Sequence, residues 1–173
     1  MGKQRSTASN IAPRSSTTTK FRAVRRPPAV SEPSTTPSAT TFHLLVTRET
    51  STADKIHVIR QGVKARLVDE MVRYLDVPKH VVFTILHTPE STAHRLIRDN
   101  RALDPATSER VVRIADVTRL AEEIFGGREA AARWLKTPNL ALADATPLSM
   151  LDTEPGAAEV RRVLSSIDYG GTV

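Results

Sequence analysis

The chain of 173 residues contains no cysteine, and this absence narrows the kinds of site that it can hold. Without cysteine there is no disulfide scaffold, no thiolate metal site and no cysteine nucleophile. Aromatic residues make up only 4% of the sequence, so any core has to be built from Val, Leu, Ile and Ala. No apolar run approaches the roughly 18 residues that a membrane-spanning helix needs. We predict a cytoplasmic protein without a membrane segment.

Catalytic and metal-binding patterns are also scarce. The five histidines lie between His43 and His94, and no two have the i, i+4 spacing of a helical zinc site. Adjacent carboxylates, as in Asp69-Glu70 and Glu122-Glu123, point to different helix faces and form no dyad. Gly126-Gly127 could hold an anion before a helix, but a helix end explains it better. We predict no enzymatic activity, no metal site and no cofactor.

The net charge of the chain is concentrated in its first 41 residues. They hold seven Lys and Arg against Glu32 alone, whereas residues 42–173 carry 18 basic and 18 acidic groups. Five prolines and almost no large apolar side chains accompany this charge. Such a segment cannot bury enough surface to offset the entropy lost on ordering. We predict that residues 1–41 are a disordered basic tail, with a transit peptide or a non-specific phosphate-binding arm as alternatives.

Beyond residue 52 the apolar residues recur at the three- and four-residue spacing of helices. One stripe consists of Ile56, Ile59, Val63, Leu67, Met71 and Leu75, which Gly62 divides into a short lead-in and a helix at about 63–75. Further helices are predicted at about 78–86, 90–99, 105–125, 128–137 and 155–167, with a helical turn at 147–151. Residues 42–52 are predicted to be a linker, in which Phe42–Thr47 could form one short strand. The pattern predicts an all-α fold.

Two features of the later helices stand out. The helix predicted at 105–125 follows Asp104, a good N-cap, and stops at Gly126, a residue typical of helix ends. In the next helix, Trp134 and Leu135 lie on an apolar face. A lone tryptophan on such a face usually packs inside the protein. We therefore predict that Trp134 and Leu135 belong to the structural core.

The helices predicted at 78–86 and 90–99, joined by a short break, have the lengths of a helix-turn-helix motif. In that motif the first residues of the second helix reach base edges in the major groove. Hydroxyl, imidazole and guanidinium groups are suitable donors there, and arginine can bind guanine through two hydrogen bonds. The candidate DNA-binding residues are Ser91, Thr92, His94, Arg95 and Arg98. The same spacing also fits an ordinary helical hairpin with a hydrated outer face.

Several short blocks in the second half of the chain occur in a characteristic order. They are His87–Arg95, Leu103–Val117, Ala131–Asn139, Thr146–Thr153, Gly156 and Ile167–Gly170. In this order they resemble the Xre/MbcA/ParS antitoxins, the partners of RES-domain toxins, and the resemblance covers about residues 60–173. One departure is visible. The family usually has glycine after the Ala-Leu that precedes Thr-Pro-Leu, where this chain has Ala143.

The resemblance implies a helix-turn-helix-like DNA-binding module at 53–112 and a toxin-binding domain at 113–173. It also implies that the C-terminal end of the antitoxin enters or borders the toxin's active-site pocket, where glycines let the backbone approach closely. The corresponding toxin-binding residues are Asp168, Tyr169, Gly170, Gly171, Thr172 and Val173. A glycine-rich terminus is otherwise normally frayed, and that interpretation stays open.

On this interpretation the chain is an antitoxin that sterically blocks a RES-domain toxin, an enzyme that depletes NAD⁺. The resemblance further implies antitoxin homodimers within a hetero-oligomeric toxin–antitoxin complex, and repression of the pair's own operon by binding to operator DNA. Two other classes remain. One is a stand-alone helix-turn-helix transcriptional regulator whose C-terminal half only dimerises, and the other is a nucleoid protein that binds through its basic tail.

Overall fold

The computed structural model of the chain describes residues 41–170, so almost all of the tail predicted to be disordered, residues 1–41, lies outside the described residues. In chain order the helices are α1 (Phe42–Thr47), α2 (Thr52–Gln61), α3 (Leu67–Leu75), α4 (Lys79–Ile85), α5 (Glu90–Arg98), α6 (Pro105–Phe125), α7 (Arg128–Lys136) and α8 (Glu154–Asp168). Two 3-10 helices, η2 (Leu140–Leu142) and η3 (Pro147–Asp152), precede α8. Within residues 41–170 the only β-type pairing is an isolated bridge between Lys64 and Ala102. The predicted all-α fold is confirmed.

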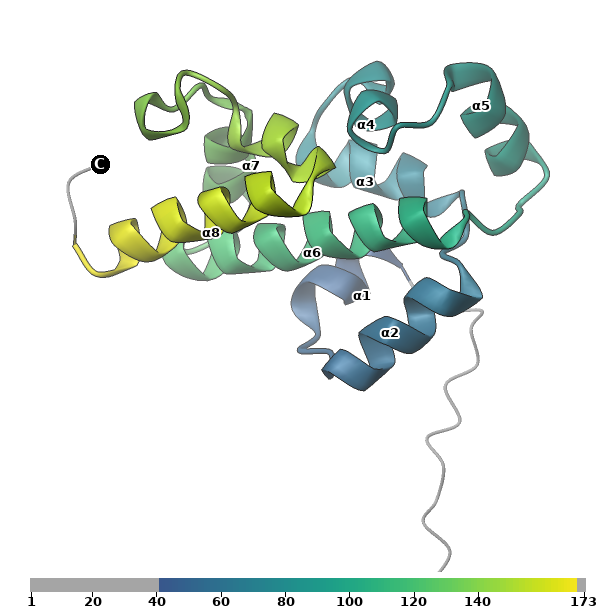
Figure 1. Cartoon of the computed structure of the whole chain (residues 1–173), viewed down its shortest axis with the longest axis horizontal. Helices are drawn as coiled ribbons and strands as arrows, with labels where there is room; N and C mark the ends of the chain where they lie inside the picture. Colours follow the sequence, from purple (N-terminus) through teal and green to yellow (C-terminus); the bar gives the residue numbers. More distant parts are fainter. Residues whose placement is uncertain (1–40, 171–173) are drawn as a thin grey trace, which may run out of the picture. The chain divides into compact units, whose positions relative to one another are not determined.

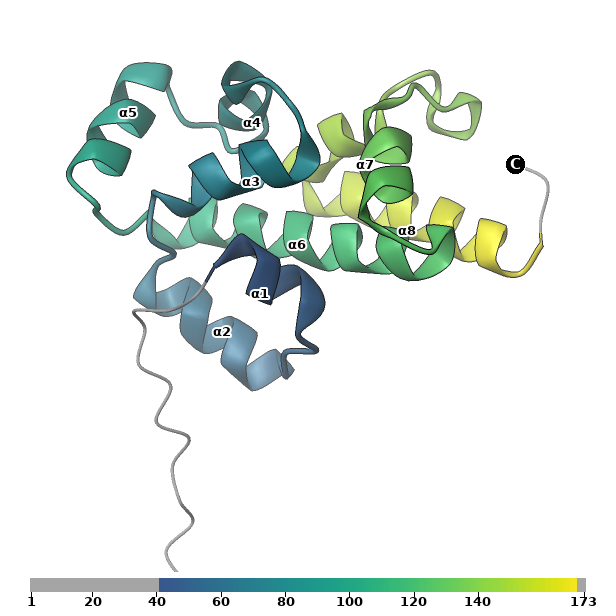
Figure 2. The ribbon, with the colours of Figure 1, turned by 180° about the vertical axis from the view of Figure 1, so that it is seen from behind.

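The longest helix, α6, lies at the centre of the fold. In Figures 1 and 2, α3 and α4 lie above one half of α6, α7 lies above the other half, and α8 runs alongside. Helices α1 and α2 pack on its opposite side. The apolar stripe predicted for α6 is buried at Val111, Ile114, Val117 and Ala121. Because α6 crosses residues 112 and 113, the two predicted domains share a helix and its core.

Both ends of α6 have the structures that the sequence predicts. The Asp104 carboxylate accepts hydrogen bonds from the backbone nitrogen and the hydroxyl of Thr107, at 3.0 Å and 2.6 Å. The hydroxyl bond is the main reason that the pKa of Asp104 lies below its ordinary value. At the other end Gly126 has a φ of 76°, the left-handed conformation in which glycine commonly ends a helix. These two residues set the length of the central helix.

The segment predicted to be a linker, residues 42–52, contains the helix α1 instead of the short strand considered for Phe42–Thr47. In a strand, Phe42, Leu44 and Val46 would share a face, because side chains alternate. In the structure Phe42 and Val46 are completely buried while Leu44 is 45% exposed, as one turn of helix requires. A segment of six residues is too short for its apolar pattern to distinguish the period of a helix from that of a strand. Packing against α3 and α6 decides in favour of the helix.

The apolar stripe from Ile56 to Leu75 is divided at Gly62, as predicted, but the helix expected at about 63–75 begins later. Helix α2 ends at Gly62, which has a φ of 82°, and α3 begins only at Leu67. The two parts of the stripe therefore belong to separate helices that face different neighbours. Ile56 is 43% exposed, whereas Met71 is completely buried. Spacing alone could not give the start of α3, because Val63 lies four residues before Leu67 and so continues the helical period outside the helix.

Two basic residues of α7 bind the C-terminal end of α3. Arg128 donates hydrogen bonds to the carbonyl oxygens of Arg73 and Tyr74, at 2.8 Å and 2.9 Å, and lies over the Tyr74 ring. Lys136 donates to both the carbonyl oxygen and the carboxylate of Asp76, each at 2.9 Å. The end of a helix leaves carbonyl groups without intrahelical partners, and these bonds satisfy them. The two halves of the described chain thus pack directly against each other.

A buried arginine of α6 binds residues of both η3 and α8. The side chain of Arg113 is only 8% exposed, and a charge at that depth needs partners. Its guanidinium pairs with the carboxylates of Glu109 and Glu154, and donates to the Leu151 carbonyl oxygen at 3.1 Å. Since Leu151 belongs to η3 and Glu154 to α8, one side chain on α6 holds both elements in position.

Candidate functional site

Helices α4 and α5 form a pair joined by a tight turn, and their inner sides belong to the core. Val82 and Ile85 of α4 and Ala93 of α5 are buried. In the turn His87 adopts a left-handed φ of 53°, and its Nε2 lies 3.3 Å from the carboxylate of Asp152. Because Asp152 ends η3, the turn is also held from the C-terminal half of the chain. The predicted helices at 78–86 and 90–99 are therefore present, within a residue at each end.

The predicted DNA-binding residues lie together on α5, where Thr92 is half-buried and the others are exposed, namely Ser91, His94, Arg95 and Arg98. The His94 ring packs edge-on against Phe83, with ring centroids 5.4 Å apart, so its orientation is restricted. Arg98 donates to the carboxylate of Asp99 at 3.0 Å. Within residues 41–170, the side chain of Arg95 makes no hydrogen bond or ion pair. Its guanidinium is therefore the group on α5 most available to an external acceptor.

Helix α8 extends beyond the packed core at its C-terminal end. Ile167 is still half-buried against the core, whereas Asp168, Tyr169 and Gly170 are exposed, and Tyr169 is 89% exposed. A tyrosine combines a large apolar ring with a hydroxyl, which is why tyrosine is frequent in protein interfaces. The remaining predicted toxin-binding residues lie outside the described residues, namely Gly171, Thr172 and Val173.

The loop between α7 and η3 presents another exposed apolar side chain, which the sequence analysis missed. Leu140 in η2 is 82% exposed. In Figures 1 and 2 this loop lies on the side of the fold where α8 ends, and η2 contacts α8. No local signal identifies such a residue, because the exposure of one leucine depends on what packs around it. Exposed apolar residues that gather at one end of a molecule are typical of protein interaction sites.

The same loop contains the alanine that replaces the glycine usual in the family. Ala143 follows η2 with φ 53° and ψ 44°, the left-handed conformation. A residue with a Cβ adopts it at a cost of roughly 1–2 kcal/mol. Glycine avoids that cost, but it loses more entropy on folding, which offsets part of the gain. We therefore expect Ala143→Gly to raise the free energy of unfolding by about 0.5–1 kcal/mol. Urea unfolding measures the effect, and Ala158→Gly on the exposed face of α8 should instead destabilise. Equal losses in both variants would contradict the prediction.

Trp134 and Leu135, both predicted to lie in the core, differ in their burial. Leu135 is completely buried. Trp134 is half-buried and packs on Phe125, with ring centroids 5.4 Å apart and the planes tilted by 38°. The tryptophan therefore covers the edge of the core, while the leucine fills its interior. Neither side chain lies at the exposed ends of α5 or α8.

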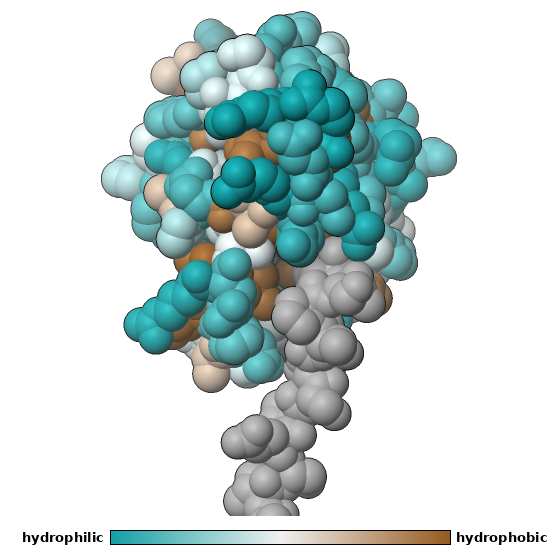
Figure 3. Space-filling view, turned by 90° about the vertical axis from the view of Figure 1, so that its right-hand side faces the viewer, coloured by the Kyte–Doolittle hydropathy of each residue, from teal (hydrophilic) through white to brown (hydrophobic). Residues whose placement is uncertain are grey.

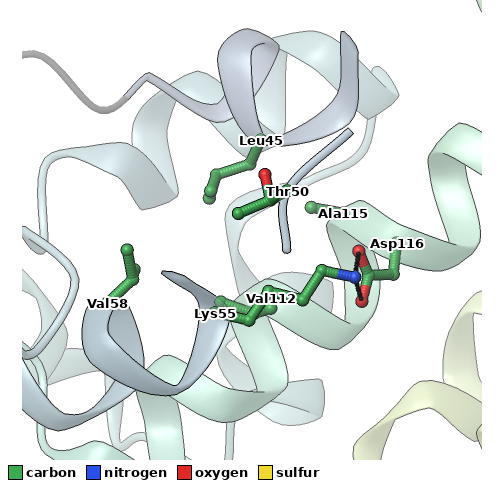
Figure 4. A pocket seen from close by; sticks show the side chains of 7 residues that line it. All are labelled: Leu45, Thr50, Lys55, Val58, Val112, Ala115 and Asp116. Atoms are coloured by element: carbon green, nitrogen blue, oxygen red, sulfur yellow. Dashed lines mark hydrogen bonds and ion pairs between the residues drawn. The ribbon is translucent and has the colours of Figure 1, made fainter. Parts of the chain in front are cut away.

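Figure 4 shows a shallow cavity between α1, α2 and α6. It is lined by Leu45, Thr50, Lys55, Val58, Val112, Ala115 and Asp116. Its two charged groups bind each other, with Lys55 Nζ 2.7 Å from the Asp116 carboxylate. This cavity therefore offers no unpaired acid or base for chemistry. In the part of the chain that the structure describes, no group of His, Asp and Glu is arranged to hold a metal ion.

None of the helices in residues 41–170 is both long enough and apolar enough to span a bilayer.

Comparison with known protein families gives two matches. Residues 54–116 match the antitoxin Xre-like helix-turn-helix domain, a region that includes α4 and α5. Residues 120–170 match the antitoxin Xre/MbcA/ParS C-terminal toxin-binding domain, which extends from the last turn of α6 to Gly170. The two matches meet inside α6.

Individual relatives also match the chain. The chain is 31% identical over 129 residues to the Prs ADP-ribosylating antitoxin of Sphingobium sp., an alignment that covers 69% of this chain and 81% of that protein. It is 28% identical over 113 residues to the antitoxin Xre of Yersinia enterocolitica, covering 65% and 76% respectively. With the antitoxin Xre of Pseudomonas putida it shares 34% identity over 82 residues, or 47% and 52%. The chain therefore belongs to the Xre/MbcA/ParS family of antitoxins, with an Xre-like helix-turn-helix domain followed by a toxin-binding domain.

Proposed function

We propose that this antitoxin neutralises a RES-domain toxin by covering the toxin's active-site pocket with its C-terminal end. One observation carries the proposal: the region that matches the toxin-binding domain, residues 120–170, ends on the exposed tip of α8. There Tyr169 is exposed and has almost no packing within the described chain. An exposed aromatic side chain on a narrow helix end has the shape to enter a concave site of a partner. Leu140 supplies a further apolar contact on the same side of the fold.

The proposed toxin acts on NAD⁺. The relative from Sphingobium is named a Prs ADP-ribosylating antitoxin, and ADP-ribosylation transfers the ADP-ribose part of NAD⁺ to an acceptor. A toxin that only degrades NAD⁺ binds the same molecule. Steric occlusion of a pocket for NAD⁺ stops either reaction, because neither can begin without the dinucleotide. This is why an antitoxin of this kind needs no catalytic group of its own.

The test of this proposal is co-expression of the full chain with a RES-domain toxin. We expect the toxin to co-purify with the chain and cellular NAD⁺ to remain at its normal level. Expression of the toxin alone should deplete NAD⁺ or mark a protein with ADP-ribose. If the chain binds its promoter DNA but captures no such protein, the stand-alone transcriptional regulator is the better interpretation.

We also propose that α4 and α5 bind operator DNA and repress the antitoxin's own operon. The matched helix-turn-helix region contains α5, whose outer residues can donate hydrogen bonds to bases. Dimeric helix-turn-helix proteins bind two half-sites about one helical turn apart, so operator binding suits a homodimer within the toxin–antitoxin complex. Operator DNA and NAD⁺ share the cytoplasm of a bacterial cell, and the proposed activity is therefore cytoplasmic.

Arg95→Ala tests this second activity. If the Arg95 guanidinium binds a base, operator affinity should fall by about 1–3 kcal/mol and base preference should relax at one position. Toxin binding should stay unchanged, because α5 is not part of residues 120–170. Gel-shift titration with operator variants measures both effects. Unchanged affinity in an Arg95→Ala, Arg98→Ala double variant would remove the assignment of α5 as the DNA-reading helix, while leaving the antitoxin activity untouched.

A further inference from the structure

We infer that Lys64 and Arg101 form a second, phosphate-binding contact with duplex DNA, beside the helix α5. Neither residue belongs to the two helices of the motif. Lys64 lies in the connection between α2 and α3, and Arg101 in the connection between α5 and α6. The inference rests on the proposed operator binding and adds to it the part of the surface that fixes the position of the protein on the DNA backbone.

The two connections are held side by side by backbone pairing, although they are far apart in sequence. Lys64 and Ala102 form the isolated antiparallel bridge. The hydrogen bonds around it run from Ala65 N to the Arg101 oxygen at 2.9 Å and from Leu103 N to the Val63 oxygen at 2.8 Å. The backbones of Lys64 and Arg101 are therefore neighbours in the folded chain. Arg101 comes three residues after the end of α5, so the pair lies close to the C-terminal end of that helix.

Gly62 makes this close approach possible. It has a φ of 82°, and a Cβ added there would lie 2.5 Å from the carbonyl oxygen of Leu103, where no real Cβ fits. The next residue is also fixed, since the backbone nitrogen of Val63 donates to the buried Ser108 hydroxyl at 2.9 Å. Both basic side chains therefore extend from a backbone of defined position. Such preorganisation reduces the entropy that a contact with DNA would otherwise cost.

The charges on this surface favour an anionic partner. Lys64 and Arg101 are exposed, and within the described residues neither makes an ion pair. Two of the nearest acids in the sequence are paired with other cations, Asp99 with Arg98 and Asp69 with Lys79. The Asp104 carboxylate accepts hydrogen bonds from Thr107, which fix its position but leave its charge. Figure 3 looks onto the side of the fold that carries α5, and hydrophilic residues cover most of its upper part. Cations that flank a reading helix typically contact phosphates and set its register on the duplex.

The experiment compares the full chain with its Lys64→Gln, Arg101→Gln double variant on two DNA duplexes. One duplex is the promoter fragment upstream of the antitoxin's gene, and the other is a scrambled duplex of the same length. Each phosphate contact contributes about 0.9 to the slope of log affinity against log salt, so the variant's slope should fall by about 2. Affinity should fall on both duplexes by the same factor, because phosphates carry no sequence information. Arg133→Gln, on the exposed face of α7, is the matched control and should change neither quantity.

The outcomes separate this inference from the proposed function. If the wild-type chain binds DNA and the double variant keeps its salt slope, the second contact is absent while operator binding stands. If the variant loses affinity on the promoter fragment alone, the pair reads bases, and a phosphate contact is overturned. If the wild-type chain binds neither duplex, the proposed operator binding fails and the inference fails with it. Thermal unfolding of the double variant should match the wild type, since both replaced side chains are exposed.

Discussion

A chain that ends after Ile167 is expected to keep its fold and to bind the toxin, yet to lose the ability to protect cells from it. The truncation removes Asp168 to Val173, of which the described residues are all exposed. Little apolar surface is therefore lost from the core. The rest of the toxin-binding domain, including the exposed Leu140, is retained. If the terminus fills the NAD⁺ pocket, its removal reopens that pocket inside an intact complex.

Three measurements on the truncated and full-length chains separate binding from inhibition. Co-purification reports binding, consumption of NAD⁺ by the purified complex reports inhibition, and thermal unfolding reports the fold. We expect only the second to change, from complete inhibition to nearly the activity of free toxin. Full neutralisation by the truncated chain would show that the terminus is merely frayed. Inhibition would then operate through the helical surface or through the assembly.

Leu135→Ala is expected to lower the free energy of unfolding by about 2–5 kcal/mol, the usual cost of emptying a leucine site in a core. Leu135 is completely buried in α7, the helix that joins the two halves of the fold through Arg128 and Lys136. A small domain is stable by only about 5–15 kcal/mol, so this loss threatens folding itself. Toxin binding and operator binding should then fail together at raised temperature.

Trp134→Ala is the informative comparison, because tryptophan is the larger side chain but here lies at the edge of the core. It should lose mainly the contact with Phe125, an aromatic pair of the kind worth about 0.5–1.5 kcal/mol beyond area burial, and part of its apolar burial. Urea unfolding of both variants should therefore place Leu135→Ala below Trp134→Ala. The reverse order would mean that Trp134 carries more of the core than its half-buried position indicates.

Prediction from sequence succeeded where local chemistry determines the structure. The start of α6 follows from Asp104, whose side chain accepts a hydrogen bond within the first helical turn. Its end follows from Gly126, which adopts a left-handed φ. The helices α4 and α5 were also predicted within a residue at each end, because Pro78 and Pro89 lie at their starts. The family resemblance rests on ordered blocks of residues, and both matched regions confirm it.

Prediction failed where distant parts of the chain decide the outcome. Phe42–Thr47 fits either a strand or a helix, and only the surface of α6 and α3 selects the helix. The helix predicted at about 63–75 begins only at Leu67, because residues 63–65 pair instead with the backbone of residues 101–103. The exposure of Leu140 could not be predicted, because it depends on how the neighbouring elements pack around it.

The sequence by itself determined the largely helical composition, the ends of α4, α5 and α6, and the row of donors on α5, since these depend on residues within a few positions of one another. Only the tertiary structure decided which distant segments of the chain pack against each other. It paired Lys64 with Ala102 in a backbone bridge, which makes Arg101 a neighbour of Lys64. It also bound α7 to the end of α3 through Arg128 and left Tyr169 outside the core. Such contacts depend on long-range packing and on backbone hydrogen bonds between remote segments. The spacing of apolar residues along the chain does not predict these contacts.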